Sequence, residues 1–232
     1  MMDANHKLFK KKYLKILSCY DATSASIAKL VGCDAVLIGD SIGVLVLGHA
    51  NTSEIDINTL LEFLKIIKKQ TRLPIIADLP AKSMISTKKA VQDAKKLIHQ
   101  GADIIKIEGH EEVIELIQKL KSFGIAVCSH IGQMPQKKIT KQKPLQYTKI
   151  AKSLEEAGAD MIVLSKMTSL SNRKISECVN IPTIGYQNSK FCRGKVDVLY
   201  AAMNLIKGEE IKININQQSQ VFKTIKNFFQ NK

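Results

Sequence analysis

The stretch Gln100–Ile107, which reads QGADIIKI, shows within eight residues how this chain passes from helix to strand. Gly101 stands where an amphipathic segment stops, and the apolar run after it is typical of a buried strand. Two other stretches read almost alike, VGCDAVLI at 31–38 and AGADMIVL at 157–164. A turn that recurs in this form predicts strands that follow helices along most of the chain.

Seven apolar runs are predicted to be strands, and an eighth run is a weaker candidate. They lie at 14–20, 34–40, 73–79, 102–108, 124–130, 159–165, 181–186 and, for the weaker run, 195–200. Between most of them lie windows whose apolar residues recur about every 3.6 residues, as expected of helices. About eight alternating units in 232 residues favour an α/β fold of the (β/α)₈ barrel type over an open sheet.

The sequence has no Gly-, Ser- or Pro-rich linker that would divide it. We therefore expect residues 1–232 to form a single barrel domain. The segment near 218–230 has apolar residues at helical spacing and is predicted to be a C-terminal amphipathic helix. Such a helix would pack either on the barrel or on a neighbouring chain.

A formal net charge of +14 is the unusual feature of the composition. This charge would fit nucleic-acid binding or the attraction of anionic small molecules. The lysines sit singly or in short clusters, however, and aromatic residues make up only 5% and are not interleaved with them. A stacking platform for bases needs such interleaving, so we expect a lysine-rich surface and no nucleic-acid partner.

The composition also bears on the compartment. No run of about eighteen uncharged apolar residues occurs, so a membrane partner is not expected. The N-terminal residues lack the apolar stretch and small-residue cleavage site of a secretory signal. Five cysteines are scattered without CxxC spacing, which is typical of reduced thiols. These features together predict a cytoplasmic protein.

Polar residues stand where successive predicted strands end. In a barrel these ends meet at one rim, which is where the chemistry of such folds lies. The residues concerned are Asp40, Ser41, Asp78, Lys106, Glu108 and His130. A lone histidine is more often structural, but its place in SHIGQMPQ, just beyond a strand, favours a functional role for His130.

The three carboxylates at this rim would repel one another unless they bind a cation or one of them has a raised pKa. Oxygen ligands of this kind suit a hard divalent ion such as Mg²⁺. Lys106 lies two residues before Glu108, so it would point to the same side and could hold an anionic substrate group. The alternative is that the carboxylates cap helices or pair with lysine, and their occurrence on successive strands favours the metal site.

Six motifs occur along the chain in the order SCYDAT, VLIGDSIGVLVLGHANT, IIADLP, IKIEG, VCSHIGQMPQ and IPTIG. In these motifs the chain resembles the ketopantoate hydroxymethyltransferase family, over roughly residues 14–205. The resemblance implies a TIM barrel of the pyruvate/phosphoenolpyruvate-binding type and a homo-oligomer. It implies an enzyme of pantothenate biosynthesis that uses Mg²⁺ and transfers a hydroxymethyl group from methylene tetrahydrofolate to 3-methyl-2-oxobutanoate.

The resemblance also implies roles for the residues at the rim. The metal ligands would be Asp40 and Asp78, with Glu108 as the third carboxylate of the site. The 2-oxo acid would be held by Ser41, Asp78 and Lys106, with His130 close to it. A divalent ion chelated by the 2-oxo acid would acidify the neighbouring C–H bond and stabilise the enolate.

The sixth strand departs from the family pattern. The family usually has VLE there, and its glutamate is taken as the proton-abstracting base. This chain reads VLSKM, which places Ser165 at that position with Lys166 beside it. A serine has little basicity near neutral pH, so we expect proton transfer through another group, namely Lys166, His130 or a metal-bound water.

Two further stretches depart from the family pattern. The loop after the seventh strand reads IGYQNS at 184–189 instead of IGIGAG, near the folate side, and KKITKQKP at 137–144 replaces a longer loop. These departures leave two alternatives open. One is a different Mg²⁺-dependent lyase or aldolase of 2-oxo acids in the same superfamily, and the other is a paralogue that has lost catalysis.

Overall fold

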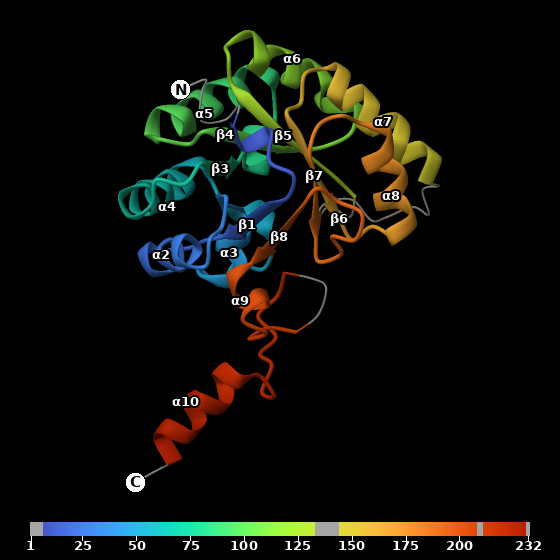
Figure 1. Ribbon diagram of the computed structural model, residues 1–232. Coiled ribbons are helices and arrows are strands. Elements are labelled where there is room, and N and C mark those ends of the chain that lie inside the picture. Colours follow the sequence, from blue (N-terminus) through green and yellow to red (C-terminus); the bar gives the residue numbers. More distant parts are fainter. Residues whose placement is uncertain (1–6, 133–143, 208–210, 231–232) are drawn as a thin grey trace.

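The centre of the protein is a closed barrel of eight parallel strands, arranged in the order in which they occur in the sequence (Figure 1). The computed structural model describes residues 7–132, 144–207 and 211–230. The strands are β1 (Leu14–Ser18), β2 (Ala35–Ile38), β3 (Ile75–Asp78), β4 (Ile104–Glu108), β5 (Ala126–Gly132), β6 (Met161–Ser165), β7 (Thr183–Tyr186) and β8 (Gly194–Val198). The predicted barrel is confirmed, and so is the weaker eighth strand.

Helices alternate with the strands and cover the outside of the barrel (Figure 1). They are α2 (Ala22–Leu30), α3 (Ser41–Leu45), α4 (Ile57–Gln70), α5 (Thr87–Gln100), α6 (Ile114–Ser122), α7 (Pro144–Glu156), α8 (Ser169–Cys178) and α9 (Leu199–Ala202). Three 3₁₀ turns join them, η1 (Thr52–Glu54), η2 (Ala81–Ser83) and η3 (Glu111–Val113). None of the helices in the described part of the chain is long and apolar enough to cross a membrane.

Two apolar clusters make up the core, one inside the barrel and one between the barrel and the helices. Ile76 and Ile104 belong to the inner cluster, whereas their neighbours Ile75 and Ile105 belong to the outer one. Successive side chains of a strand point to opposite faces, and this accounts for the alternation. The same alternation, continued past the apolar core, decides which polar residues face the mouth of the barrel.

The three near-identical turns share one contact that sets the register of the sheet. In each of them an aspartate precedes a strand, and its carboxylate accepts a hydrogen bond of 2.8–2.9 Å from a backbone N–H of the strand before it. The backbone N–H of the same aspartate donates to the carbonyl of that residue. The pairs are Asp34 with Lys15, Asp103 with Ile75 and Asp160 with Val127. Each of these turns therefore fixes its strand to the neighbouring strand at two points.

Replacing Asp160 with alanine is expected to lower the free energy of unfolding by about 2 kcal/mol, because the N–H of Val127 then loses its charged acceptor. Urea denaturation would measure the change. Glu177→Ala is the matched control, since Glu177 pairs with Arg173 on the exposed surface and should contribute less than about 0.5 kcal/mol. Equal stability of the two variants would contradict the role given to Asp160.

The C-terminal helix α10 (Gln220–Gln230) stands away from the barrel (Figure 1). None of its residues is buried, and the side chains of Phe228 and Phe229 are 76% and 75% exposed. Helix α10 lies within the segment near 218–230 where the sequence predicts a helix. Of the two packings expected for it, packing on its own barrel is not what the structure shows.

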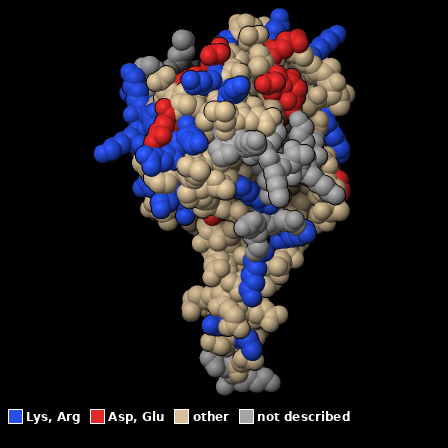
Figure 2. All heavy atoms as spheres, turned by 90° about the vertical axis from the view of Figure 1, so that its right-hand side faces the viewer, with Lys and Arg blue, Asp and Glu red and all other residues tan. Residues whose placement is uncertain are grey.

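On the face that Figure 2 shows, the positive charge is spread out rather than gathered in one place. Figure 2 shows Lys and Arg in small groups on one face, separated by neutral atoms and by clusters of Asp and Glu. This distribution agrees with the expectation of a lysine-rich surface. It offers no continuous basic stripe on that face for a nucleic-acid backbone to follow.

Candidate active site

Polar side chains meet at the carboxyl ends of the strands, where the inward alternation of the barrel continues. Asp78 follows the inward-facing Ile76 by two residues, Lys106 follows Ile104 in the same way, and His130 follows Cys128. The side chains therefore point into the barrel mouth and are shielded from solvent. The exposed fractions are 4% for Asp78, 6% for Lys106 and 7% for His130.

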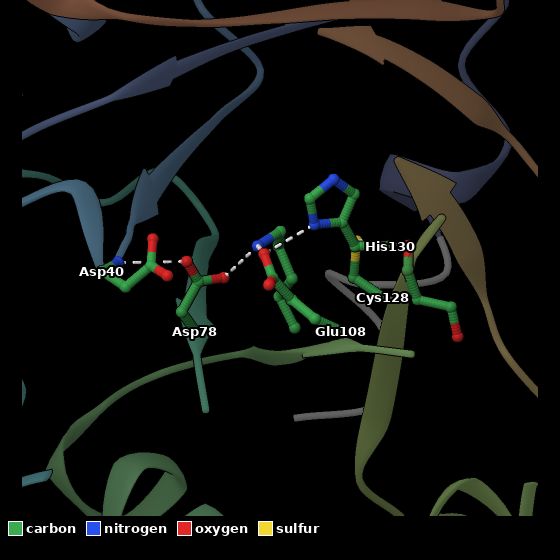
Figure 3. Close-up of polar contacts among 7 residues, drawn as sticks. Asp40, Asp78, Glu108, Cys128 and His130 are labelled. Carbon is green, nitrogen blue, oxygen red and sulfur yellow. Dashed lines mark hydrogen bonds and ion pairs between the residues drawn. The ribbon is translucent and has the colours of Figure 1, made fainter. Parts of the chain in front are cut away.

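These side chains form a row of polar contacts from β2 to β5 (Figure 3). Lys106 Nζ lies 2.6 Å from Asp78 Oδ1 and 3.3 Å from Glu108 Oε1. His130 Nδ1 lies 2.7 Å from Glu108 Oε1, and the backbone N–H of Asp40 donates to Asp78 Oδ2 over 3.1 Å. The structure thus brings together five residues that the sequence placed at one rim.

The approach of Asp40 to Asp78 depends on the glycine before it. A Cβ atom on Gly39 would lie 2.9 Å from Leu37 Cδ2 and 3.0 Å from Asp78 Oδ2, so a side chain has no room there. Asp40 is followed by Ser41, which is buried at the first position of α3. Gly39 therefore allows the backbone N–H of Asp40, just after β2, to reach the carboxylate of Asp78 on β3.

Charges in the row shift the pKa values of three groups. Burial, and after it repulsion from Asp78 and Glu108, raises the pKa of Asp40 well above its ordinary value. Burial alone would raise the pKa of Glu108, but Lys106 and His130 more than offset it and hold that pKa below its usual range. Burial would lower the pKa of Lys106, but the surrounding carboxylates raise it, so the ammonium group stays charged.

The row has an excess of negative charge, which is the property that a cation site requires. Three acidic side chains (Asp40, Asp78 and Glu108) stand against the ammonium group of Lys106 and the imidazole of His130, so acidic groups outnumber basic ones in the row. Carboxylate oxygens are the ligands that hard divalent ions prefer. The donor set therefore fits a divalent cation such as Mg²⁺.

Lys106 changes how the carboxylates are arranged. Within the described residues, no three His, Cys, Asp or Glu side chains are grouped as a ready metal site. Lys106 Nζ instead bridges Asp78 and Glu108. The assignment of Asp40, Asp78 and Glu108 as metal ligands stays a prediction, and so does the role of Lys106 in holding the substrate.

Several buried polar atoms near the mouth have no hydrogen-bond partner among the described residues. They are Ser18 Oγ, Tyr20 Oη, Thr52 Oγ1 and His130 Nε2. Tyr20 lies beside Ser41, and Thr52 lies beside Asp40. A buried polar group without a partner costs about 1–3 kcal/mol, so these atoms mark a place where a polar ligand can bind. Ser18, Tyr20 and Thr52 are not among the site residues predicted from the sequence, although SCYDAT ends the first strand.

Ser165 and Lys166 differ in how they relate to the row. Ser165 ends β6, continues the inward alternation after Val163 and is buried. A Cβ atom on Gly132 would lie 2.1 Å from the carbonyl oxygen of Ser165, so β5 and β6 meet closely here. Lys166 follows with a φ of 53°, and no hydrogen bond or ion pair within the described ranges joins it to Glu108.

The IGYQNS loop folds back onto the end of β7. Tyr186 follows the inward-facing Ile184 by two residues, and burial raises its pKa to about 12. Asn188 donates to the carbonyl of Met167, and its own carbonyl accepts a hydrogen bond from Asn172. The phenol of Tyr186 is therefore held half-buried at the mouth. Of the segment 137–144, residues 137–143 lie outside the described residues.

Comparison with known proteins identifies the family of the chain. The sequence model for ketopantoate hydroxymethyltransferase matches residues 3–231. A relative from Thermotoga maritima, named 3-methyl-2-oxobutanoate hydroxymethyltransferase, is 37% identical over 211 residues, which cover 86% of this chain and 78% of the relative.

Solved structures of other enzymes share the fold. A 2,3-dimethylmalate lyase of the PEP mutase/isocitrate lyase superfamily superposes with a TM-score of 0.68 at 16% identity, over 88% of this chain and 83% of that one. A phosphonopyruvate hydrolase in complex with oxalate and Mg²⁺ superposes with a TM-score of 0.70 at 14% identity, over 87% and 81%. At such identities the likeness extends to the barrel alone, whereas the sequence matches over nearly the whole chain identify the family. The chain belongs to the ketopantoate hydroxymethyltransferase family.

Proposed function

We propose that this protein transfers a hydroxymethyl group from methylene tetrahydrofolate to 3-methyl-2-oxobutanoate and so forms ketopantoate for pantothenate biosynthesis. The observation that carries the proposal is the row from Asp40 to His130 at the barrel mouth, in a chain of this family. Carboxylates with excess negative charge, a charged lysine and a histidine are the groups that enolate chemistry on a 2-oxo acid requires.

Mg²⁺ would be held by Asp40 and Asp78, and when bound it would polarise the carbonyl of the 2-oxo acid and stabilise negative charge on its oxygen. The excess charge of the row supports this choice, and so does the Mg²⁺ found in phosphonopyruvate hydrolase. Glu108 Oε1 already accepts from Lys106 and lies against His130, so its share in the metal site stays a prediction.

The carboxylate of the 2-oxo acid would be held by Lys106 and Ser41. Lys106 supplies a charged donor in a site shielded from water, where such hydrogen bonds are strong. The hydroxyl groups of Ser18 and Tyr20 lack partners and would satisfy the remaining oxygens of the ligand. Binding would thus convert several unpaired polar groups into hydrogen-bonded ones.

The purified protein is expected to form ketopantoate from 3-methyl-2-oxobutanoate and methylene tetrahydrofolate in the presence of Mg²⁺. After treatment with a chelator the rate should fall to the uncatalysed level and return when Mg²⁺ is added back, because the carbonyl is no longer polarised. Mass spectrometry of the product would follow the reaction. Absence of ketopantoate from a folded, Mg²⁺-loaded protein would contradict the proposed function.

A second candidate is a lyase or aldolase that acts on another 2-oxo acid in the same site. The half-buried phenol of Tyr186 favours it, because a loop of small residues is expected at that place, near the folate side. Titration calorimetry distinguishes the two. Binding of the 2-oxo acid without any binding of the folate would support the second candidate.

We further propose that the protein is a cytoplasmic homo-oligomer. The support for an oligomer is α10, which exposes Ile225, Phe228 and Phe229 away from the barrel. An isolated helix of this length is marginal in water, so a covered apolar face would stabilise it. Light scattering in solution tests the oligomeric state.

A further inference from the structure

The imidazole of His130 is held in one orientation by its neighbour on β4. The sheet register pairs Glu108 with His130, so the two side chains leave adjacent strands side by side. His130 Nδ1 lies 2.7 Å from Glu108 Oε1. Because an ionised carboxylate only accepts, the hydrogen of a neutral ring sits on Nδ1, and Nε2 carries a free lone pair.

The second ring nitrogen of His130 is buried and has no partner. Nε2 makes no hydrogen bond within the described residues, although the side chain is almost wholly shielded from solvent. Figure 3 shows this nitrogen on the far side of the ring from Glu108. A lone pair in this position is free to accept a proton from a bound molecule.

We propose that His130 is the general base of this enzyme, with Glu108 as its positioning residue. In this step, which rests on the proposed function, the C3–H bond of 3-methyl-2-oxobutanoate breaks and the proton bonds to His130 Nε2. The electron pair of that bond forms the C2=C3 double bond of the enolate, and the negative charge moves to the C2 oxygen. The imidazolium then releases the proton to solvent or to the folate nitrogen that is freed on transfer.

The other inward-facing groups are poorly suited to this step. Lys106 is charged and paired with two carboxylates, so it has no lone pair to offer. Burial raises the pKa of the Cys128 thiol to about 12, which keeps its proton in place. Ser165 carries a hydroxyl group, which is not basic near neutral pH. His130 offers a buried ring nitrogen, Nε2, that makes no hydrogen bond to any described residue.

The ring protonation can be read directly, without metal or substrate. In the ¹⁵N-labelled, metal-free protein, NMR is expected to find that the neutral ring of His130 carries its proton on Nδ1. His99, exposed at the end of α5, provides the reference signals of an unrestrained ring. A neutral His130 ring with its proton on Nε2 would overturn the inference.

Exchange of the C3 proton tests the base itself. With Mg²⁺ in D₂O and no folate, the wild-type protein should exchange this proton, and His130→Gln should do so at least about 100-fold more slowly. His99→Gln is the matched control and should exchange at the wild-type rate, and calorimetry should find the 2-oxo acid bound to both variants. Imidazole added to His130→Ala should restore part of the exchange, which a purely structural role would not allow.

The outcomes separate the base from the overall reaction. If the wild type exchanges the C3 proton but forms no ketopantoate, the proposed function fails and the role of His130 stands. If the wild type forms ketopantoate and His130→Gln exchanges within about threefold of it, the inference fails and the function stands. A wild-type protein that neither exchanges the proton nor turns over would overturn both.

Discussion

Replacing Asp40 with asparagine is expected to reduce ketopantoate formation at least about 100-fold and to make the metal-free protein more stable. Asparagine keeps the shape of the side chain but lacks the negative charge that would hold a divalent ion. Without the ion, the carbonyl of the 2-oxo acid would not be polarised. The gain in stability has a separate cause. The carboxylate of Asp40 is buried beside Asp78 and Glu108, and asparagine removes that repulsion.

The sign of the stability change follows from the pKa of Asp40. Its pKa is raised in the folded protein, so above its unfolded value of about 3.9 the ionised group destabilises the fold. This penalty grows as the pH rises toward the folded pKa and stays at its full size above it. At neutral pH, Asp40→Asn should therefore raise the free energy of unfolding.

Urea denaturation with a chelator present, at pH 7.5 and at pH 4, would measure this effect. The advantage of Asp40→Asn should shrink at the lower pH, where the wild-type carboxyl is neutral. Asp56→Asn is the matched control, because the backbone N–H of Thr59 lowers the pKa of Asp56 and the charged form is the favoured one. A metal-free Asp40→Asn protein that is less stable than wild type would contradict this account.

Replacing Lys106 with methionine is expected to lower the free energy of unfolding of the metal-free protein by about 3–5 kcal/mol. Lys106 Nζ pairs with both Asp78 and Glu108 inside the barrel, and its loss leaves buried carboxylates without a counter-charge. Turnover should also fall at least about 100-fold, since the substrate loses its charged donor. Because Lys106 is buried, we expect this substitution to destabilise the protein more than any other single substitution in the row.

Thermal unfolding with and without Mg²⁺ gives the sharper test of Lys106. A divalent ion can replace the missing ammonium group, so Mg²⁺ should raise the unfolding temperature of Lys106→Met more than that of the wild type. Lys96→Met is the control, because its partner Asp93 keeps a second lysine, Lys89. The free energy of unfolding of this variant should fall by less than about 1 kcal/mol. Equal shifts with Mg²⁺ for Lys106→Met and wild type would contradict the replacement of the ammonium group by the ion.

The barrel could be predicted from the sequence because the evidence for its strands and helices is local. Apolar runs, helical spacing and turn glycines each lie within about ten residues, and parallel strands leave one place for their carboxyl ends to meet. The convergence of Asp78, Lys106, Glu108 and His130 followed from that rule alone. The repeated aspartates were visible too, but their purpose was not, because Asp160 binds a backbone group 33 residues earlier in the chain.

The parts that the sequence did not predict depend on how side chains pair in space. Lys106 was expected to hold a substrate, yet in the folded chain it bridges two carboxylates. The unpaired hydroxyl groups of Ser18 and Tyr20 become visible once neighbouring atoms are in place. The amphipathic pattern of α10 predicted that the helix packs on the barrel or on a neighbouring chain, but such a pattern does not identify the surface.

The lysine within the row has a consequence for how the enzyme would be supplied in the cell with the Mg²⁺ proposed above. Lys106 already balances part of the charge at the barrel mouth, so we expect a newly made chain to fold before a divalent ion binds. Synthesis and metal loading can then take place at different times. During metal shortage the cell would keep a reserve of intact but idle enzyme, and activity would return with the ion, without new protein being made.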